Sequence, residues 1–304
     1  MKYLIIGAGG TGGMIAAALH LKNFDTSVIA RGNHLLAIKE NGLHIKSKLL
    51  GDFTAKLKAF SQEEYTETPD VVFVCVKDYS LNEIIPFLKK FCITETIIIP
   101  ILNVFGTGEK IQKEIPNAIV LDGCIYIIAF KSNVGEISHP SDMFKIVFGK
   151  RDCQQLVDSE LIQVERDLKS AGIQAYLSDK ITSDTFAKVT LISPYAACGA
   201  YFDITVGEMQ KEGEARNFLI GLLGELQKTA DKMKLNLGFD VVERNLAIID
   251  KMSPDTISSL YRDIKNNHQS EIDGQIFEIV RLGKKLGIEV PYYRKVAEKF
   301  GFKD

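Results

Sequence analysis

Two kinds of hydrophobic pattern follow one another along the chain. Up to about residue 176, short apolar runs rich in β-branched residues alternate with segments of helical periodicity. This alternation is typical of βαβ units and of a mostly parallel sheet. A helix is expected at about 155–171. The predicted strands span residues 3–6, 26–30, 71–76, 96–102, 118–126 and 173–177.

Beyond Thr182 the strand pattern stops, and apolar residues recur every three or four positions, which indicates amphipathic helices. We therefore predict an α/β protein with a doubly wound first domain, residues 1–178, and an all-helical second domain, residues 179–304. No Pro/Ser-rich linker separates them, so the junction is expected to be a packed elbow. The clearest helical repeat consists of Phe218, Leu219, Leu222, Leu223, Leu226 and Ala230.

A glycine-rich turn connects the first predicted strand to an alanine-rich helix. Its residues are Gly7, Ala8, Gly9, Gly10, Thr11 and Gly12. In a G-x-G-x-x-G turn, the first glycine permits the tight turn, the second lets a pyrophosphate approach the backbone, and the third lets the helix pack on the strand. The free N–H groups of the helix attract phosphate charge. Strand and helix supply the required context, so we predict a dinucleotide site; a purely structural glycine turn is the alternative.

Composition narrows the classes of partner. The chain has 304 residues, 46% of them apolar, and a formal net charge of only −2, which favours a folded protein with a small-molecule partner over one that binds nucleic acid. No apolar run approaches the roughly 18 residues of a membrane helix, and no signal-like segment precedes the first strand. We therefore expect a cytoplasmic protein without a membrane partner.

Cysteines and histidines give no sign of a metal. The five cysteines are scattered without a C-x-x-C pair, and the five histidines show no i, i+4 pairing. We predict no metal site and expect the cysteines to be reduced, buried small hydrophobes.

Two basic residues follow predicted strands at the edge where cofactors bind in open α/β sheets. Arg31 stands after the second strand, where an NAD-preferring fold usually carries an acidic residue for the ribose. Its guanidinium offers forked donors to a 2′-phosphate, so NADPH is favoured over NADH. Lys77 follows the third strand and could contact phosphate or ribose. A solvated loop charge is the alternative for each.

The order of motifs resembles that of the ketopantoate reductases, also called 2-dehydropantoate 2-reductases. The resemblance runs from the first strand to the last helix. It implies an N-terminal Rossmann domain followed by a helical domain of the 6-phosphogluconate dehydrogenase type, with the active site in the cleft between them. The motifs that carry it are Gly7-Ala8-Gly9 with Gly12, Ala30-Arg31-Gly32, Lys77, Asn103, Ser258 to Asp263, Ser270 to Gly274, and Gly287 to Pro291.

The resemblance also implies roles for individual residues. Lys188 lies where the family carries its catalytic lysine, which polarises and protonates the substrate carbonyl. Glu271 would be its acidic partner and Ser259 would bind the substrate carboxylate, whereas Asn103 would fix nicotinamide and substrate together. A solvated helix lysine, an exposed helix carboxylate, an N-cap serine and an asparagine after a strand are the plain alternatives.

The chain departs from the family on the lysine helix. Most ketopantoate reductases carry substrate-binding asparagines four and eight residues after the lysine, where this chain has Ile192 and Ala196. An isoleucine cannot replace an amide as donor or acceptor. Ser193 could supply a hydroxyl if the helix were shifted or bulged at Pro194. The substrate is therefore left open.

We accordingly predict an NADPH-dependent reductase of a small 2-oxo acid, with ketopantoate as the first candidate. Reduction of another small 2-oxo acid is one alternative. A sensor that binds NADPH without turnover is the other. A homodimer is compatible with the sequence, which does not define the oligomeric state.

Overall fold

The computed structural model describes residues 1–151 and 158–303, and it forms two compact units. The first unit comprises Met1–Leu102 and Gly106–Ile181, and the second comprises Asn103–Phe105 and Thr182–Asp304. Cys153 and the first residues of the helix expected at 155–171 lie outside the described residues. The chain thus contributes three residues to the second unit long before its main part begins.

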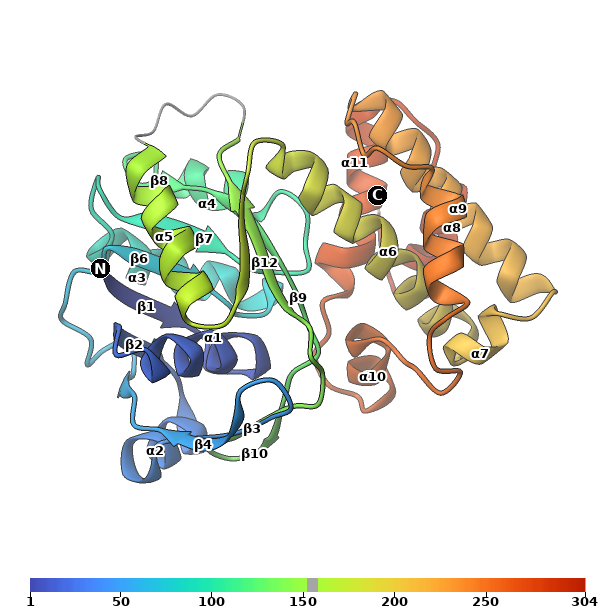
Figure 1. The fold of residues 1–304 in the computed structure, drawn as a ribbon. Coiled ribbons are helices and arrows are strands. Elements are labelled where there is room, and N and C mark those ends of the chain that lie inside the picture. The colour runs from blue at the N-terminus through green and yellow to red at the C-terminus, as the bar shows by residue number, and fades with distance from the viewer. Residues whose placement is uncertain (152–157, 304) are drawn as a thin grey trace. The chain divides into compact units, whose positions relative to one another are not determined.

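A six-stranded parallel sheet is the centre of the first unit, with strand order β5-β2-β1-β6-β7-β8 (Figure 1). Helices connect most of these strands, as the alternation of apolar runs and helical segments predicted. The strands are β1 (Lys2–Ile6), β2 (Asp25–Ile29), β5 (Lys58–Phe60), β6 (Val71–Val74), β7 (Ile97–Pro100) and β8 (Ile119–Val120), and the helical elements are α1 (Gly10–Leu21), α2 (Gly32–Asn41), η1 (Asp78–Ser80), α3 (Leu81–Phe91) and α4 (Thr107–Glu114).

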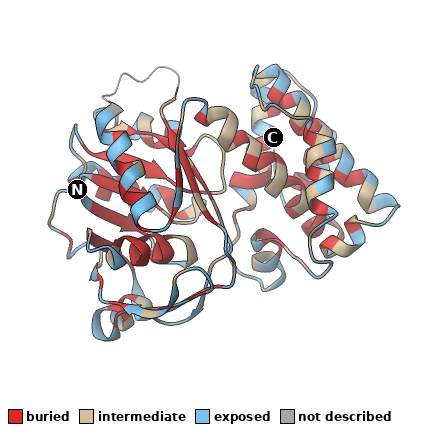
Figure 2. Cartoon of the chain, viewed as in Figure 1, coloured by how far each residue is buried: buried red, intermediate tan, exposed pale blue. Residues whose placement is uncertain are grey.

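The central strands and α1 are buried, which explains their almost continuous apolar sequences (Figure 2). β1 pairs with β2 on one side and with β6 on the other, so the strand order reverses next to β1. Ligands of open α/β sheets bind beside the carboxyl ends of the strands at such a switch point. The glycine turn begins at this position.

Two smaller mixed sheets complete the first unit, and the hydrophobic pattern did not predict most of their strands. One has the order β10-β11-β3-β4 and the other β13-β12-β9. The bounds are β3 (Leu43–Ser47), β4 (Gly51–Ala55), β9 (Asp122–Ile127), β10 (Phe130–Asn133), β11 (Glu136–His139), β12 (Phe144–Gly149) and β13 (Gln174–Ser178); α5 (Asp158–Ser170) precedes β13.

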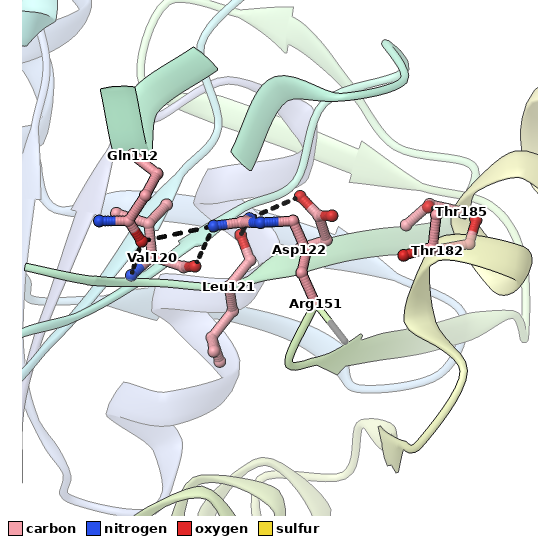
Figure 3. Close-up of polar contacts among 7 residues, drawn as sticks. All are labelled: Gln112, Val120, Leu121, Asp122, Arg151, Thr182 and Thr185. Atoms are coloured by element: carbon pink, nitrogen blue, oxygen red, sulfur yellow. Dashed lines mark hydrogen bonds and ion pairs between the residues drawn. The ribbon is translucent and has the colours of Figure 1, made fainter. Parts of the chain in front are cut away.

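The single strand expected over residues 118–126 is wrong, because the chain leaves the parallel sheet after β8 and enters another sheet as β9. Arg151 holds this bend (Figure 3). Its guanidinium donates to the carbonyls of Val120 (2.7 Å) and Leu121 (3.2 Å) and to the Asp122 carboxylate (3.2 Å). The Gln112 side chain also pairs with β8, accepting from the Val120 N–H at 3.3 Å.

All elements that the structure describes in residues 182–303 are helical, in agreement with the predicted pattern. Their apolar faces form one core, which includes Leu219, Leu222, Leu226 and Ile276. The elements are α6 (Ile181–Phe202), α7 (Val206–Met209), α8 (Glu214–Lys232), α9 (Val241–Ile249), α10 (Ser259–Lys265), the π-helix η2 (Asp273–Phe277), α11 (Glu278–Leu286) and α12 (Pro291–Lys299).

Helix α6 continues through Pro194 over 22 residues. Proline has no N–H, so the carbonyl of Thr190, four residues earlier, lacks its usual helical donor. The buried Asn245 amide from α9 donates to this carbonyl at 2.8 Å and to the Thr190 hydroxyl at 3.1 Å. A side chain from a neighbouring helix thus replaces the missing backbone bond.

No helix in the described part of the chain is long and apolar enough to cross a membrane.

Candidate active site

The glycine turn of the first unit has the geometry that a pyrophosphate requires. Gly7 has φ +102°, and a Cβ there would lie 2.9 Å from the Cys75 carbonyl oxygen; a Cβ on Gly12 would collide with the Gly7 carbonyl. A Cβ on Gly9, at the N-cap of α1, would meet no atom within 4 Å. The first N–H groups of a helix have no intrahelical partner. The turn therefore offers N–H donors beside open space, into which phosphate oxygens fit.

Ala8, Gly10 and Thr11 complete this turn. Ala8 is buried, and its carbonyl accepts a bond from His34 Nε2 at 2.8 Å. The other ring nitrogen, Nδ1, accepts from the Gly135 N–H at 3.0 Å. The proton therefore resides on Nε2, and burial lowers the pKa of His34. Nothing in the sequence pattern indicates that His34, three residues after Arg31, connects the glycine turn to Gly135.

Arg31 stands at the N-cap of α2, two residues after the end of β2, and is exposed. Its guanidinium lies 3.3 Å from the Glu83 carboxylate, in a pair whose side chains are 81% and 60% exposed. Such an exposed pair contributes little stability, so the guanidinium can turn to another anion at small cost. Lys77 is half-buried and occupies the N-cap position of η1.

In the second unit, Lys188 and Asn103 meet. Lys188 lies on α6 and is only 6% exposed, and its ammonium donates to the Asn103 side-chain carbonyl at 2.5 Å. The two residues are 85 positions apart in the chain, and they come together because Asn103–Phe105 belongs to the helical unit. A buried cation with an amide neighbour is suited to stabilising negative charge on a reacting oxygen.

Apolar residues stand near both members of this pair in the chain. Phe105, two residues after Asn103, packs edge-to-face on Phe186 of α6, with ring centroids 5.1 Å apart. Ile192 is half-buried one turn beyond Lys188, and Ala196 is buried one turn further. The positions that carry amides in most ketopantoate reductases are thus apolar here.

Glu271 is 4% exposed and lies just before the π-helix η2. Its carboxylate Oε2 is 3.5 Å from the Gln275 amide nitrogen, and its backbone carbonyl accepts from the Gln275 N–H at 2.9 Å. Turns of π-helix are rare and occur frequently at functional sites. This π-helical turn follows the acidic residue, whereas α6 continues as one α-helix through Pro194.

The two serines differ in their surroundings. Ser259 is exposed in the first turn of α10, whereas the N-cap of that helix is the buried Ser258, whose hydroxyl accepts from the Tyr261 N–H at 3.0 Å. Ser193 is 1% exposed, and its hydroxyl is bonded to the Gln275 carbonyl and the Tyr293 hydroxyl. Ser193 thus has two hydrogen-bond partners within the helical unit, and α6 continues past it from Ile181 to Phe202.

Within the described residues, no group of three or more His, Cys, Asp or Glu side chains is arranged to hold a metal ion.

Comparison with known proteins identifies the class and then the family. Residues 3–152 match the family model "Ketopantoate reductase PanE/ApbA", and residues 180–303 match the model of its C-terminal part. The chain is 27% identical to the uncharacterized oxidoreductase YkpB of Bacillus subtilis, over 97% of this chain and 96% of that protein.

Solved structures share the fold. The 2-dehydropantoate 2-reductase of Porphyromonas gingivalis is 27% identical, with a TM-score of 0.83 and 99% of both chains covered. A D-mandelate dehydrogenase with NADH and anilino(oxo)acetate is 23% identical, with a TM-score of 0.87 and 98% and 96% covered. A dimeric ketopantoate reductase of Staphylococcus aureus is 21% identical, with a TM-score of 0.83 and 98% and 97% covered.

A parallel dinucleotide-binding sheet followed by a helical unit defines a class of nicotinamide-dependent oxidoreductases. The chain belongs to the ketopantoate reductase family, whose members are oxidoreductases of 2-oxo acids.

Proposed function

We propose that the protein reduces the keto group of a small 2-oxo acid with NADPH, and that ketopantoate is the first substrate to test. The observation that carries the proposal is the buried Lys188 ammonium, held at 2.5 Å by Asn103 on the helical unit. Bound NADPH would supply a hydride to the carbonyl carbon. It would be held by the glycine turn, with Lys77 as a further phosphate or ribose contact and Asn103 beside the nicotinamide.

Lys188 has two tasks in this mechanism. Its ammonium stabilises the negative charge that collects on the carbonyl oxygen as the carbon accepts a hydride, and it then gives that oxygen a proton. Asn103 orients the ammonium through its side-chain carbonyl. The product is a 2-hydroxy acid, and the lysine recovers its proton from water.

Glu271 and Ser259 complete the proposal. Glu271 is buried just before the π-helix η2, and its carboxylate would orient Lys188 or accept a bond from a substrate hydroxyl. Ser259, exposed in the first turn of α10, would bind the substrate carboxylate through its hydroxyl.

A 2-oxo acid with an apolar side chain is the second candidate substrate. Ketopantoate carries a hydroxyl group, and a site built to bind a hydroxyl discriminates strongly because its polar groups are otherwise left unpaired. Ile192 and Ala196 supply no such polar group, and Phe105 and Phe186 add aromatic surface. These four side chains favour an aliphatic or aromatic substituent.

The test is NADPH oxidation against a panel of 2-oxo acids that includes ketopantoate and apolar analogues, with Lys188→Ala beside the native protein. We expect turnover of at least one of these acids and a loss of about 10³-fold in kcat/KM in the variant, by the size of comparable electrostatic contributions. Turnover that survives in Lys188→Ala would overturn the mechanism. NADPH binding without turnover of any acid would favour a sensor.

A further inference from the structure

A chain of buried hydroxyl and carbonyl groups connects three helical elements of the second unit. Tyr293 of α12 is fully buried, and its hydroxyl lies 2.7 Å from the Ser193 hydroxyl of α6. Ser193 Oγ in turn lies 2.8 Å from the backbone carbonyl of Gln275 in the π-helix η2. Ser193 was considered above as a source of a substrate-binding hydroxyl, whereas Tyr293 and Gln275 have been assigned no role in the reaction.

The direction of each hydrogen bond in this series follows from the group at its end. The Gln275 carbonyl can only accept, so Ser193 must use its one hydroxyl proton there. Ser193 Oγ then accepts from the Tyr293 hydroxyl. The direction is therefore from Tyr293 to Ser193 to Gln275, and each member has a defined partner.

The chain ends beside Glu271. The Gln275 side-chain amide donates toward Glu271 Oε2 at 3.5 Å, and the Gln275 N–H donates to the Glu271 carbonyl at 2.9 Å. Gln275 is therefore held from one side by Ser193 and contacts Glu271 on the other. Gln275 belongs to the π-helix η2, and turns of this kind occur frequently at functional sites.

The other end of the chain is anchored by Glu225 of α8. Glu225 is 3% exposed, and its two carboxylate oxygens accept from the Tyr292 N–H at 2.6 Å and the Tyr293 N–H at 2.9 Å. Because these bonds fix the first turn of α12, they also fix the backbone position from which the Tyr293 side chain extends. The result is one continuous connection from α8 through α12 and α6 to the turn that carries Glu271.

We propose that Tyr293, Ser193 and Gln275 are positioning residues that hold the Glu271 carboxylate in a fixed place relative to α6, the helix of Lys188. This rests on the proposed function, in which Lys188 and Glu271 act together. Ser193 follows Lys188 by five residues on the same helix, so the connection joins the helix of the proton donor to its acidic partner. Ser193 contacts neither substrate nor cofactor in this role.

A double-mutant cycle tests the proposal. Tyr293→Phe removes one hydroxyl from the chain and keeps the buried ring. We expect kcat to fall about tenfold with the KM for NADPH unchanged, and we expect less than about a twofold further effect of Tyr293→Phe in a Glu271→Gln background. Additive effects of the two substitutions would overturn the proposal, because a merely structural role of Tyr293 does not depend on the Glu271 carboxylate.

Tyr292→Phe is the matched control, because it removes a hydroxyl from the adjacent residue of the same helix. It should leave kcat and the melting temperature close to those of the native protein. Equal losses of kcat in both variants would also contradict the proposal.

A second measurement is independent of turnover and therefore distinguishes a failure of this proposal from a failure of the proposed function. Amide hydrogen exchange of the full chain should accelerate at residues 271–278 in Tyr293→Phe and Ser193→Ala, but not in Tyr292→Phe. Unchanged exchange at these residues would overturn the positioning role even if no 2-oxo acid were reduced.

Discussion

At the scale of single residues, Ile192 has the most direct consequence for substrate choice. It lies four residues after Lys188, on the same face of α6, and is half-buried. We predict that Ile192→Asn raises the ratio of kcat/KM for ketopantoate to that for an apolar 2-oxo acid by roughly tenfold, because the amide restores a partner for the substrate hydroxyl. Steady-state kinetics with both acids measure the ratio.

The same substitution one position earlier is the control. Leu191→Asn places an amide about 100° around the helix, next to the hydrophobic core, and should not improve ketopantoate selectively. A ratio that stays constant in Ile192→Asn would show that this position does not face the substrate.

Arg31 determines the predicted choice of cofactor. We expect Arg31→Ala to raise the Kd for NADPH roughly 10- to 100-fold and to leave NADH binding almost unchanged, since a charged hydrogen bond to the 2′-phosphate is lost. Glu83→Ala removes the partner of Arg31 but keeps the guanidinium, so it should bind NADPH at least as tightly as the native protein. Fluorescence titration with both cofactors is sufficient. Equal losses for NADPH and NADH in Arg31→Ala would refute the 2′-phosphate role.

At the scale of elements, the attachment of α12 should depend on pH. Burial raises the pKa of Glu225 from its ordinary 4.5 to about 7, although the two N–H bonds from α12 oppose the shift. A raised carboxyl pKa means that the folded chain binds the proton more tightly than the unfolded chain. This contribution to stability is therefore complete below about pH 4.5 and is lost as the pH rises to about 7.

In the native protein, Glu225 should lower the free energy of unfolding as the pH rises from 4.5 to 7. We predict that this decrease is absent in Glu225→Gln when the free energy is measured by urea unfolding. At about 1.4 kcal/mol per pKa unit, the difference in this decrease is at most roughly 3.5 kcal/mol. The slope with pH is the readout, because the amide also places an NH₂ group against a backbone N–H and changes the absolute stability. Parallel slopes for the two proteins would contradict the prediction.

The sequence predicted two kinds of element: strands that are buried on both faces, and helices that bury one apolar face. The predicted ends of β1, β2, β6 and β7 lie within two residues of the observed ends. Most strands of the small mixed sheets were missed. β4 and β10 are largely exposed and carry little apolar pattern, and β10 has no buried residue. The break between β8 and β9 depends on Arg151, some thirty positions away, which local sequence cannot reveal.

The residues of the candidate site were proposed from motif order, but their contacts were not predictable. Nothing near Ser193 in the chain indicates that its partners are 82 and 100 residues away. Pro194 does predict from the sequence that the Thr190 carbonyl needs another donor. That this donor is Asn245 is known only from the fold.

At the scale of the whole molecule, we expect a homodimer. The net charge of −2 gives little self-repulsion, and three large apolar side chains stand exposed within seven residues of the first unit: Ile128 (60%), Phe130 (43%) and Val134 (50%). Phe130 begins β10, an edge strand, and the other two residues lie just before and just after that strand. Sedimentation equilibrium should give twice the chain mass of 33.8 kDa, and Val134→Lys should reduce it.

Ile93→Lys is the control for that experiment, because Ile93 is 51% exposed elsewhere on the same unit. It should leave the sedimentation mass unchanged. A native protein of monomeric mass would contradict the expectation of a homodimer.

Because Asn103–Phe105 belongs to the second unit, the gene cannot be cut at one point into two segments that each encode one complete unit. A fragment that starts at residue 179 contains every helix after the junction, yet it lacks the asparagine that contacts Lys188 and the ring that packs on Phe186. No single cut yields the helical unit whole. Recombination that exchanged C-terminal halves between relatives would therefore join a lysine from one parent to an asparagine loop from the other, so these two segments are expected to be inherited together.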